Sequence, residues 1–301
     1  MSKMIDATFN HLWRASIPVA IAAAWLASSG AAHAETALEK IKRQGHITVG
    51  YRDDAAPFSF TDGQKNAAGY AIEYCNAVVA QIRQSVPNLR VNMRSVDVDR
   101  VMKFVNDGVV DLLCANTSDT PERRALVSFS KPIFFDGVSI AVRKKDGIEN
   151  VDQLDGKQLV VIKTTTTSDA LDAYRQKKPG SWKIEAALNP DAAFSQLQLG
   201  WVQGYARDTV PLVLQMASVA NSDQYALLPQ RLSTESIAIA FRKDDAGMTA
   251  LVNGVIANAV TSGKANDWYD KWFVKPISLG GKAKTLGIPM SAELKVALQA
   301  K

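Results

Sequence analysis

The sequence contains little histidine and little cysteine, with 3 His and 2 Cys among 301 residues. The usual zinc sites need closely spaced pairs of these residues, which the sequence lacks, so no metal site is expected. A long block of Lys and Arg is also absent, and the formal net charge of +5 is spread along the chain. This charge pattern gives no reason to expect nucleic acid as a partner.

The first 34 residues have the pattern of a secretory signal peptide. Lys3 and Arg14 precede an apolar run over residues 15–27, which leads to the small-residue site Ala32-His33-Ala34. We therefore expect export and cleavage after Ala34. The alternative is an N-terminal membrane anchor, but the apolar run is shorter than the roughly 20 residues that a spanning helix needs.

Cleavage after Ala34 would leave His46 as the one remaining histidine. Ser-His-Asp, Cys-His and H-E-x-x-H chemistries would all have to be built on this residue. It lies at the entry to a predicted strand, where a solvated histidine is more common than a catalytic one. The sequence therefore argues against most hydrolytic enzymes.

Cys75 and Cys114 are an even pair in a chain that we expect to be exported. A disulfide between them fits an oxidising compartment. The sequence does not show that they are adjacent in the fold, so the alternative is two small, buried, apolar residues.

Short β-branched apolar runs alternate with longer segments of helical periodicity, which predicts an α/β protein with mostly parallel strands. The predicted strands are residues 47–51, 89–96, 110–115, 138–143, 158–163, 202–206 and 236–242. The predicted helices are residues 69–84, 99–106, 168–177, 191–199, 209–218, 245–261 and 266–273. Segments 129–137 and 233–241 look like crossings between two units, so the block between them is expected to form its own lobe. Ligands of such proteins bind in the crevice beyond the carboxyl ends of the strands.

Two loops that follow predicted strands carry candidate binding groups. Loop 114–124 leads into a helix, and its Arg123 suits a carboxylate because the planar guanidinium matches the two oxygens. Loop 163–168 places amide and hydroxyl groups at a helix start, where anions bind. It lacks the spacing of a phosphate-binding P-loop. The alternatives are a solvated surface arginine and plain N-capping by Thr167 or Ser168.

Three further charged residues lie near predicted strand ends. Asp208 follows strand 202–206 and can accept hydrogen bonds from an ammonium group, with helix capping as the alternative. Arg52 follows the first strand and Arg100 opens helix 99–106, so both can point over one sheet edge. Single arginines are usually solvated charges, but two that converge on a crevice favour an anionic group.

Several short segments occur in a characteristic order along the chain: IKRQGHITVG at 41–50, PFSF at 57–60, GY at 69–70, GVVD at 108–111, TPERR at 120–124, VSFS at 127–130, DQLDGK at 152–157, TTS at 166–168 and KWF at 271–273. From about Ala37 onward, the chain therefore resembles the periplasmic amino-acid-binding proteins of ABC transporters, solute-binding protein family 3. Within that family it is most similar to the glutamate/aspartate-binding branch, whose C-terminal extension the segment 286–294 also resembles.

The resemblance implies an α/β fold of the type II periplasmic-binding-protein class, with two lobes, a mostly parallel sheet in each, and the ligand in the cleft between them. The implied division is a signal peptide at 1–34, a first lobe at 35–134 and 238–276, a second lobe at 139–233, and a C-terminal extension at 277–301. It further implies a monomeric periplasmic protein, not an enzyme and without a cofactor. Such a protein closes on one amino acid and delivers it to an inner-membrane ABC permease.

The resemblance also implies residue roles. In such proteins the position of Arg123 holds the ligand's α-carboxylate, and that of Asp208 meets its α-amino group. The positions that assist them correspond to Asn116, Ser118, Thr166 and Thr167. Lys163, in the same loop as Thr166, is a further candidate ligand-binding residue. Arg52, Arg100 and Asp97 occupy positions that select the ligand side chain, and the two arginines match the acidic-ligand branch.

The sequence departs from the branch at four positions. Asp97 stands where a serine is usual, and Asn116 where a serine or glycine is usual. Thr165 replaces a glycine, and Pro190 replaces a histidine. A carboxylate at Asp97 would repel an anionic side chain unless Arg52 or Arg100 neutralises it. L-Glutamate or L-aspartate is therefore the expected ligand, with glutamine or asparagine as the alternative. A dehydratase on the same scaffold is a further alternative, with Asp97, Asp208 or Lys163 as general acid or base.

Overall fold

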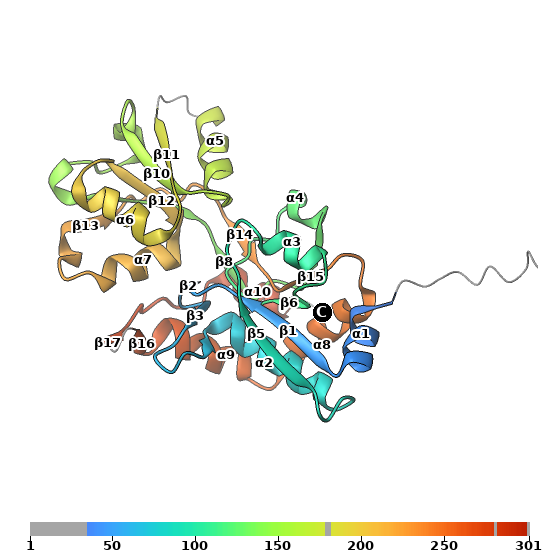
Figure 1. Cartoon of the computed structure of the whole chain (residues 1–301). Coiled ribbons are helices and arrows are strands. Elements are labelled where there is room, and N and C mark those ends of the chain that lie inside the picture. Colours follow the sequence, from blue (N-terminus) through green and yellow to red (C-terminus); the bar gives the residue numbers. More distant parts are fainter. Residues whose placement is uncertain (1–34, 178–181, 280–281, 300–301) are drawn as a thin grey trace, which may run out of the picture. The chain divides into compact units, whose positions relative to one another are not determined.

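Two five-stranded sheets organise the chain (Figure 1). This computed structural model describes residues 35–177, 182–279 and 282–299. The predicted signal peptide and its cleavage site at Ala34 lie outside the described residues. From Thr36 onward the chain belongs to one unit of contacting elements.

The first sheet has the order β5-β1-β6-β15-β7. Its strands are β5 (Arg90–Ser95), β1 (His46–Tyr51), β6 (Leu112–Leu113), β15 (Ala240–Arg242) and β7 (Val127–Phe129). Strand β1 runs parallel to β5 and β6, whereas β15 runs antiparallel to β6 and β7. The helices that follow or precede these strands are α1 (Ala37–Gln44), α2 (Tyr70–Arg83), α3 (Val101–Asn106), α4 (Pro121–Arg124), α8 (Ala246–Thr261) and α9 (Lys264–Tyr269).

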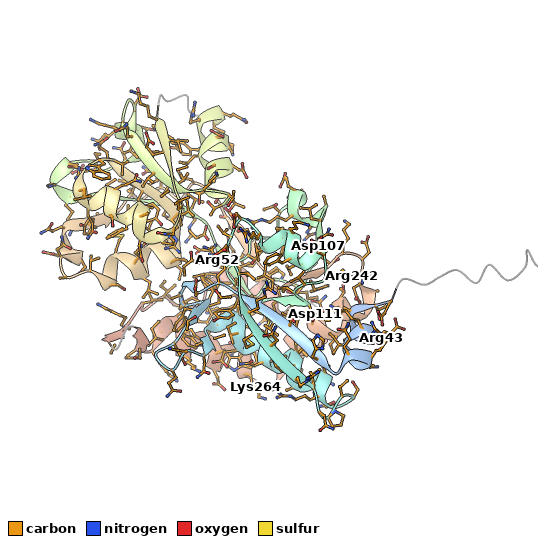
Figure 2. The ribbon with its side chains drawn as sticks, in the orientation of Figure 1. Arg43, Arg52, Asp107, Asp111, Arg242 and Lys264 are labelled. Atoms are coloured by element: carbon orange, nitrogen blue, oxygen red, sulfur yellow. A yellow bond between two sulfur atoms is a disulfide. The ribbon has the colours of Figure 1, made fainter. Side chains whose placement is uncertain are left out.

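The two faces of this sheet belong to different cores, as the period-2 alternation of side chains along a strand requires. Leu112 and Phe241 pack in the core that contains the buried residues of α2 and α8. Their neighbours Leu113 and Ala240 pack in the smaller core that contains the buried residues of α3. Buried Asp111 (Figure 2) accepts hydrogen bonds from the Thr48 amide at 2.8 Å and from the ammonium of Lys40, on α1, at 2.9 Å. It thereby ties α1 to the sheet.

The second sheet has the order β11-β10-β12-β9-β13. Its strands are β11 (Lys183–Ala187), β10 (Gln158–Ile162), β12 (Gly204–Asp208), β9 (Val138–Arg143) and β13 (Tyr225–Leu227). Strand β10 runs parallel to β11 and β12, and β9 runs antiparallel to β12 and β13. The helices of this part are α5 (Thr167–Lys177), α6 (Pro190–Leu199) and α7 (Thr209–Ser218). Along β10, Leu159 and Val161 pack with α5, whereas Val160 and Ile162 pack with α6 and α7.

Two short strands carry the chain between the sheets. Strand β8 (Phe134–Asp136) lies before the second sheet and β14 (Glu235–Ile237) lies after it, and the two pair antiparallel. They fall within segments 129–137 and 233–241, where the sequence predicts crossings. The domain boundaries themselves stay a prediction.

Smaller elements complete the described chain. They are the three-stranded sheet of β2 (Asp54–Ala55), β3 (Ser59–Thr61) and β4 (Ala67–Ala68), the hairpin of β16 (Ile277–Leu279) and β17 (Lys282–Lys284), and the helix α10 (Ala292–Gln299). Three 3-10 turns lie at Lys144–Asp146, Val151–Leu154 and Ser222–Gln224.

Some predicted elements are wrong in their extent. The single strand predicted over 236–242 is two strands, because β14 pairs with β8 while β15 belongs to the first sheet. The helix predicted over 266–273 is α9 followed by a π-helical segment, Asp270–Val274. Strand β11 is not predicted at all, because it lies at a sheet edge and four of its five residues are exposed or half-buried, which removes the apolar run.

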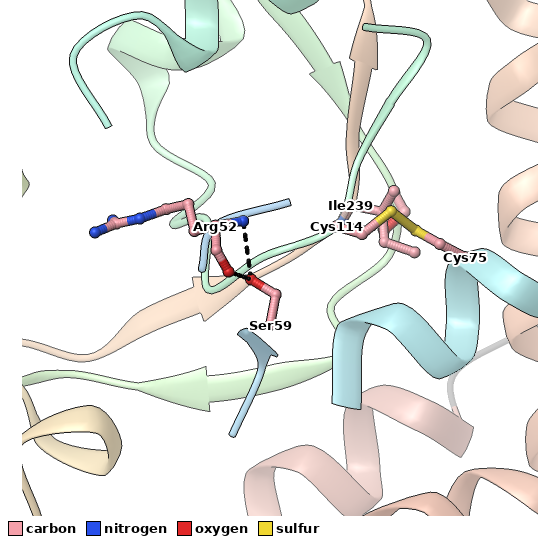
Figure 3. Close-up of a disulfide and its surroundings, with 6 residues drawn as sticks. Arg52, Ser59, Cys75, Cys114 and Ile239 are labelled. Carbon is pink, nitrogen blue, oxygen red and sulfur yellow. Dashed lines mark hydrogen bonds between the residues drawn. A yellow bond between two sulfur atoms is a disulfide. The ribbon is translucent and has the colours of Figure 1, made fainter. Parts of the chain in front are cut away.

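The two cysteines form a disulfide (Figure 3). Cys75 lies on α2 and Cys114 directly follows β6, and their Cα atoms are 6.3 Å apart. Both residues are buried in the main core of the first sheet. The disulfide therefore joins the helix to the strand, and the alternative of two unbridged cysteines is wrong.

Candidate functional site

A cavity of about 980 Å³ is lined by residues that follow strands of both sheets. On the side of the first sheet, the lining residues are 53–54, 56 and 96–99. On the side of the second sheet, they are 163–164, 188–191, 207, 211, 214–215 and 218. Among the predicted site residues, the lining includes only Asp97 and Lys163.

Six of the other predicted residues form a polar cluster beside this cavity, through hydrogen bonds or electrostatic interactions with one another or with Glu235: Arg52, Asn116, Ser118, Arg123, Thr166 and Asp208. The cluster adjoins the cavity at two places: Arg52 is ion-paired with the lining residue Asp54, and Asp208 follows the lining residue Arg207 in β12. Arg100 belongs neither to the cavity lining nor to the polar cluster, and it is exposed at the start of α3.

Arg123 is positioned by the start of the short helix α4. The Thr120 hydroxyl accepts a hydrogen bond from the Arg123 amide at 3.3 Å, and Pro121 occupies the first helical position, where its missing N–H costs nothing. The Arg123 guanidinium donates to the Ser118 carbonyl at 2.9 Å, which uses one of its five N–H groups. Burial lowers the pKa of Arg123, while the negative charges of Asp208 and Glu235 raise it. Both carboxylates therefore lie close enough to act on this guanidinium.

Asp208 ends β12, directly before α7. It occupies the N-cap position of that helix, but its side chain makes no capping hydrogen bond. Instead, the Asn116 amide donates to Asp208 Oδ2 at 2.7 Å. Burial raises the pKa of Asp208 and the charge of Glu235 raises it further, against the lowering effects of Arg207, Arg52 and the Asn116 hydrogen bond.

The same hydrogen bond orients Asn116 so that its Oδ1 atom is buried and has no hydrogen-bond partner among the described residues. A buried polar atom without a partner costs free energy of about 1–3 kcal/mol. An acceptor of this kind beside the Asp208 carboxylate is suited to a ligand that brings N–H donors.

The loop before α5 presents a threonine hydroxyl to a carboxylate from β14. Thr166 Oγ1 donates to Glu235 Oε2 at 2.8 Å, and the Ser233 hydroxyl donates to Glu235 Oε1 at 2.9 Å. Thr167 and Ser168 are the first two residues of α5 itself, so neither holds the N-cap position. Lys163 is exposed at the end of β10.

Glu235 is a residue that sequence reasoning misses. Its only signal is its place in a predicted crossing between the two units. Arg207 is missed as well, although it lies beside Asp208, directly after the predicted strand 202–206. The Arg207 guanidinium donates to the Asp54 carbonyl at 2.9 Å and to the Gln215 side chain at 3.1 Å.

Arg52 is buried and makes two parallel hydrogen bonds to Asp54, from Nε to Oδ1 and from Nη2 to Oδ2, both at 2.8 Å. Burial by itself would raise the pKa of Asp54, but the charges of Arg52 and Arg207 bring it below its ordinary value. Asp54 is thus an ionised partner for an arginine that the sequence assigns to the ligand.

Asp136, on β8, is a further buried carboxyl group close to this cluster. It accepts hydrogen bonds from the Gly137 amide at 2.9 Å and the Val210 amide at 3.1 Å. Burial and the neighbouring charge of Asp208 raise its pKa to about 7 in spite of these bonds.

Residues 35–177, 182–279 and 282–299 hold no group of three or more His, Cys, Asp or Glu side chains able to bind a metal ion. Over the same residues, no helix has both the length and the apolar character needed to cross a membrane.

Comparison with known proteins places these residues in context. The model of a family described as bacterial extracellular solute-binding proteins, family 3, matches residues 47–275. The L-glutamate/L-aspartate-binding protein of Pseudomonas aeruginosa is 32% identical over 261 residues, which cover 86% of this chain and 86% of that protein. The glutamate/aspartate import solute-binding protein of Salmonella typhimurium is 29% identical over 282 residues, 91% of this chain and 93% of that protein.

Among solved structures, an ABC uptake transporter substrate-binding protein from Streptococcus pneumoniae with bound histidine matches with a TM-score of 0.69. It is 23% identical, and the match covers 78% of this chain and 94% of that chain. The likeness establishes the fold, which is the two-lobed α/β fold of type II periplasmic binding proteins, as the resemblance predicts.

Proposed function

Because this chain belongs to the bacterial extracellular solute-binding proteins, family 3, we propose that it captures a free amino acid in the periplasm for an ABC importer. The observation that carries the proposal is the pairing of Arg123 with Asp208. A guanidinium and a carboxylate lie within electrostatic reach of each other, at the meeting of loops from both sheets. An amino acid is a zwitterion, so it offers each of these groups a partner of opposite charge.

In this proposal the α-carboxylate of the ligand binds Arg123, and the Thr166 hydroxyl turns from Glu235 to donate to it. The α-ammonium group binds the Asp208 carboxylate and donates to Asn116 Oδ1, the buried acceptor that has no partner in the described structure. Charge-assisted hydrogen bonds are about twice as strong as neutral ones, so these contacts provide affinity for every α-amino acid. The side chain then points toward Arg52 and the cavity lined by Asp54 and Asp97.

Glutamate or aspartate is the proposed ligand. The names of the Pseudomonas and Salmonella relatives support it, as does the positive charge of Arg52 beside the cluster. Glutamine or asparagine is the alternative. Titration calorimetry of the chain without residues 1–34 against the twenty amino acids tests both, and an absence of heat with every dicarboxylic amino acid would exclude the acidic ligand.

Capture is proposed to proceed by closure of the two lobes about β8 and β14, followed by docking of the closed form on the permease. A ligand that binds the folded state stabilises it by RT ln(1 + [L]/Kd). A thermal-shift screen therefore identifies ligands, and small-angle scattering with the best of them should give a smaller radius of gyration.

We propose no catalytic step. Asp97 and Lys163 are exposed and Asp208 is held by Asn116, so none of them is expected to act as a general acid or base. A ligand incubated for a long time with the protein should be recovered unchanged by mass spectrometry. Conversion of a cyclic acid would instead favour a dehydratase on this scaffold.

Binding is expected to release protons over the pH range in which the Asp208 carboxyl group of the free protein titrates. Burial and the charge of Glu235 raise the pKa of this group, so the range lies above that of an ordinary aspartate. The α-ammonium group favours the carboxylate, so binding lowers the pKa and releases a proton. Affinity should therefore fall as the pH falls through the pKa of the free protein.

The neighbouring Asp136 should act in the same direction, because an ammonium on Asp208 offsets the charge that helps to raise the pKa of Asp136. Calorimetry in two buffers of different ionisation enthalpy measures the protons released. The D136N variant should retain the proton release that is due to Asp208. Proton uptake over this pH range would contradict the assignment of Asp208 to the ammonium group.

A further inference from the structure

The cavity toward which the ligand side chain is proposed to point, here called the side-chain end of the site, carries more negative than positive charge. A receptor that binds dicarboxylates alone has no need of this surplus. Five carboxylates line the cavity, and they are Asp53, Asp54, Asp97, Asp99 and Asp191. Two cations, Lys163 and Arg207, oppose them. A second carboxylate on the ligand would enter this surplus of negative charge, where like charges disfavour each other.

Arg52, like Arg207, is a buried cation at this end, and its guanidinium is already engaged by hydrogen bonds. Two of its five N–H groups are donated in parallel to Asp54. Its backbone is held by Ser59, whose hydroxyl accepts from the Arg52 amide at 3.2 Å and donates to the Arg52 carbonyl at 2.8 Å. Figure 3 shows the side chain leading from this anchored backbone away from the disulfide.

Asp54 is held in place from the opposite side. Arg207, on β12, donates to the Asp54 carbonyl at 2.9 Å and helps to keep the pKa of the Asp54 carboxyl below its ordinary value. The ion pair of Arg52 and Asp54 is therefore part of the folded structure, with support from both sheets, and Asp54 stays ionised at neutral pH.

We propose that Asp54 is a specificity-determining residue, which offsets part of the Arg52 charge and makes the site accept amide side chains as well as carboxylates. The proposal rests on the function proposed above and extends its ligand class to glutamine and asparagine. A terminal amide can accept from a remaining Arg52 N–H and also donate to the carboxylate of Asp54 or Asp97. A carboxylate can only accept, so it gains from Arg52 but is opposed by both aspartates.

The test compares glutamate with glutamine, and aspartate with asparagine, by calorimetry on the wild-type chain and two variants. In the wild type, the two affinities of each pair should agree within about 10-fold, which corresponds to 1.4 kcal/mol. Asp54→Asn should shift the ratio toward the acidic ligand by at least about 10-fold, because Arg52 then faces the ligand without its counter-ion.

Asp53→Asn is the matched control. Asp53 is the adjacent exposed residue and lines the same cavity, whereas the two Arg52 hydrogen bonds go to Asp54. Asp53 adds to the negative charge of the cavity, but it is exposed, so solvent and salt screen its charge. Its removal should therefore change the ratio by less than about 3-fold. Equal shifts in D53N and D54N would overturn the proposal.

Other outcomes are equally decisive. A wild-type preference for glutamate over glutamine of more than about 100-fold overturns the inference and leaves the proposed function intact. An unchanged ratio in D54N does the same. If no amino acid binds the wild type, the proposed function itself fails. Thermal unfolding checks that D54N is folded. If it is not, the ratio of acidic to amide ligand affinity is measured instead in the Asp54→Ser variant and compared with the wild-type ratio.

Discussion

The Arg123→Ala variant is expected to lose binding of every amino acid, with affinities reduced by at least about 100-fold. Arg123 is the proposed partner of the α-carboxylate, which all α-amino acids share. Removing one partner of a buried, hydrogen-bonded charge pair costs about 2–5 kcal/mol, since the other charge stays buried and unpaired. Titration calorimetry with the full panel of ligands measures the loss.

Arg124→Ala provides the matched control for this variant. Arg124 is the next residue of the same helix, but it is exposed and its ion pair is with Asp119. Its removal should change affinity by less than about 3-fold, because its exposed side chain bonds Asp119, which is not among the groups proposed to bind the ligand. A similar loss in both variants would indicate damage to α4 and not the loss of a ligand contact.

Arg52→Ala is expected to behave differently from Arg123→Ala. It should mainly change which amino acid binds, because Arg52 meets the part of the ligand that differs between amino acids. Equal losses for all ligands in both variants would contradict this division between a common site and a selective one.

Removing the disulfide by the double substitution Cys75→Ala and Cys114→Ala should lower the free energy of unfolding by about 3–4 kcal/mol. The two cysteines are 39 residues apart in the sequence, so the crosslink closes a loop of that length and restricts the unfolded chain. Urea unfolding of the wild-type and double-variant proteins, followed by circular dichroism, measures the difference.

The wild type in the presence of a reductant should approach the stability of the double variant. Thiol titration of the unfolded protein verifies that the reductant has opened the bond. Equal midpoints for oxidised and fully reduced protein would show that the disulfide does not stabilise the fold. Ligand affinity should change little, since both cysteines lie in the core of the first sheet and outside the polar cluster.

The main secondary-structure elements could be predicted where one physical signal dominates. Strand β9 and helix α7 have the predicted bounds, because the strand is apolar throughout and the helix has clear helical periodicity. Strand β11 has weaker local signals, since it is largely exposed and its stability depends on pairing with β10. The split at 238–239 also escapes prediction, because the two strands that it separates belong to different sheets.

By itself, the sequence determined which chemical groups are available and in what order: one arginine after a buried strand at Arg123, an aspartate at the end of another at Asp208, and little histidine for hydrolytic chemistry. Only the tertiary structure decided which groups meet. The hydrogen bond from Asn116 to Asp208 joins residues 92 positions apart, and that from Arg207 to Asp54 joins residues 153 positions apart. Such pairs depend on strand order and register, which no local pattern encodes. For the same reason the sequence presents Arg52 as a free cation, whereas the turn into β2 places Asp54 against it and thereby changes what the site can select.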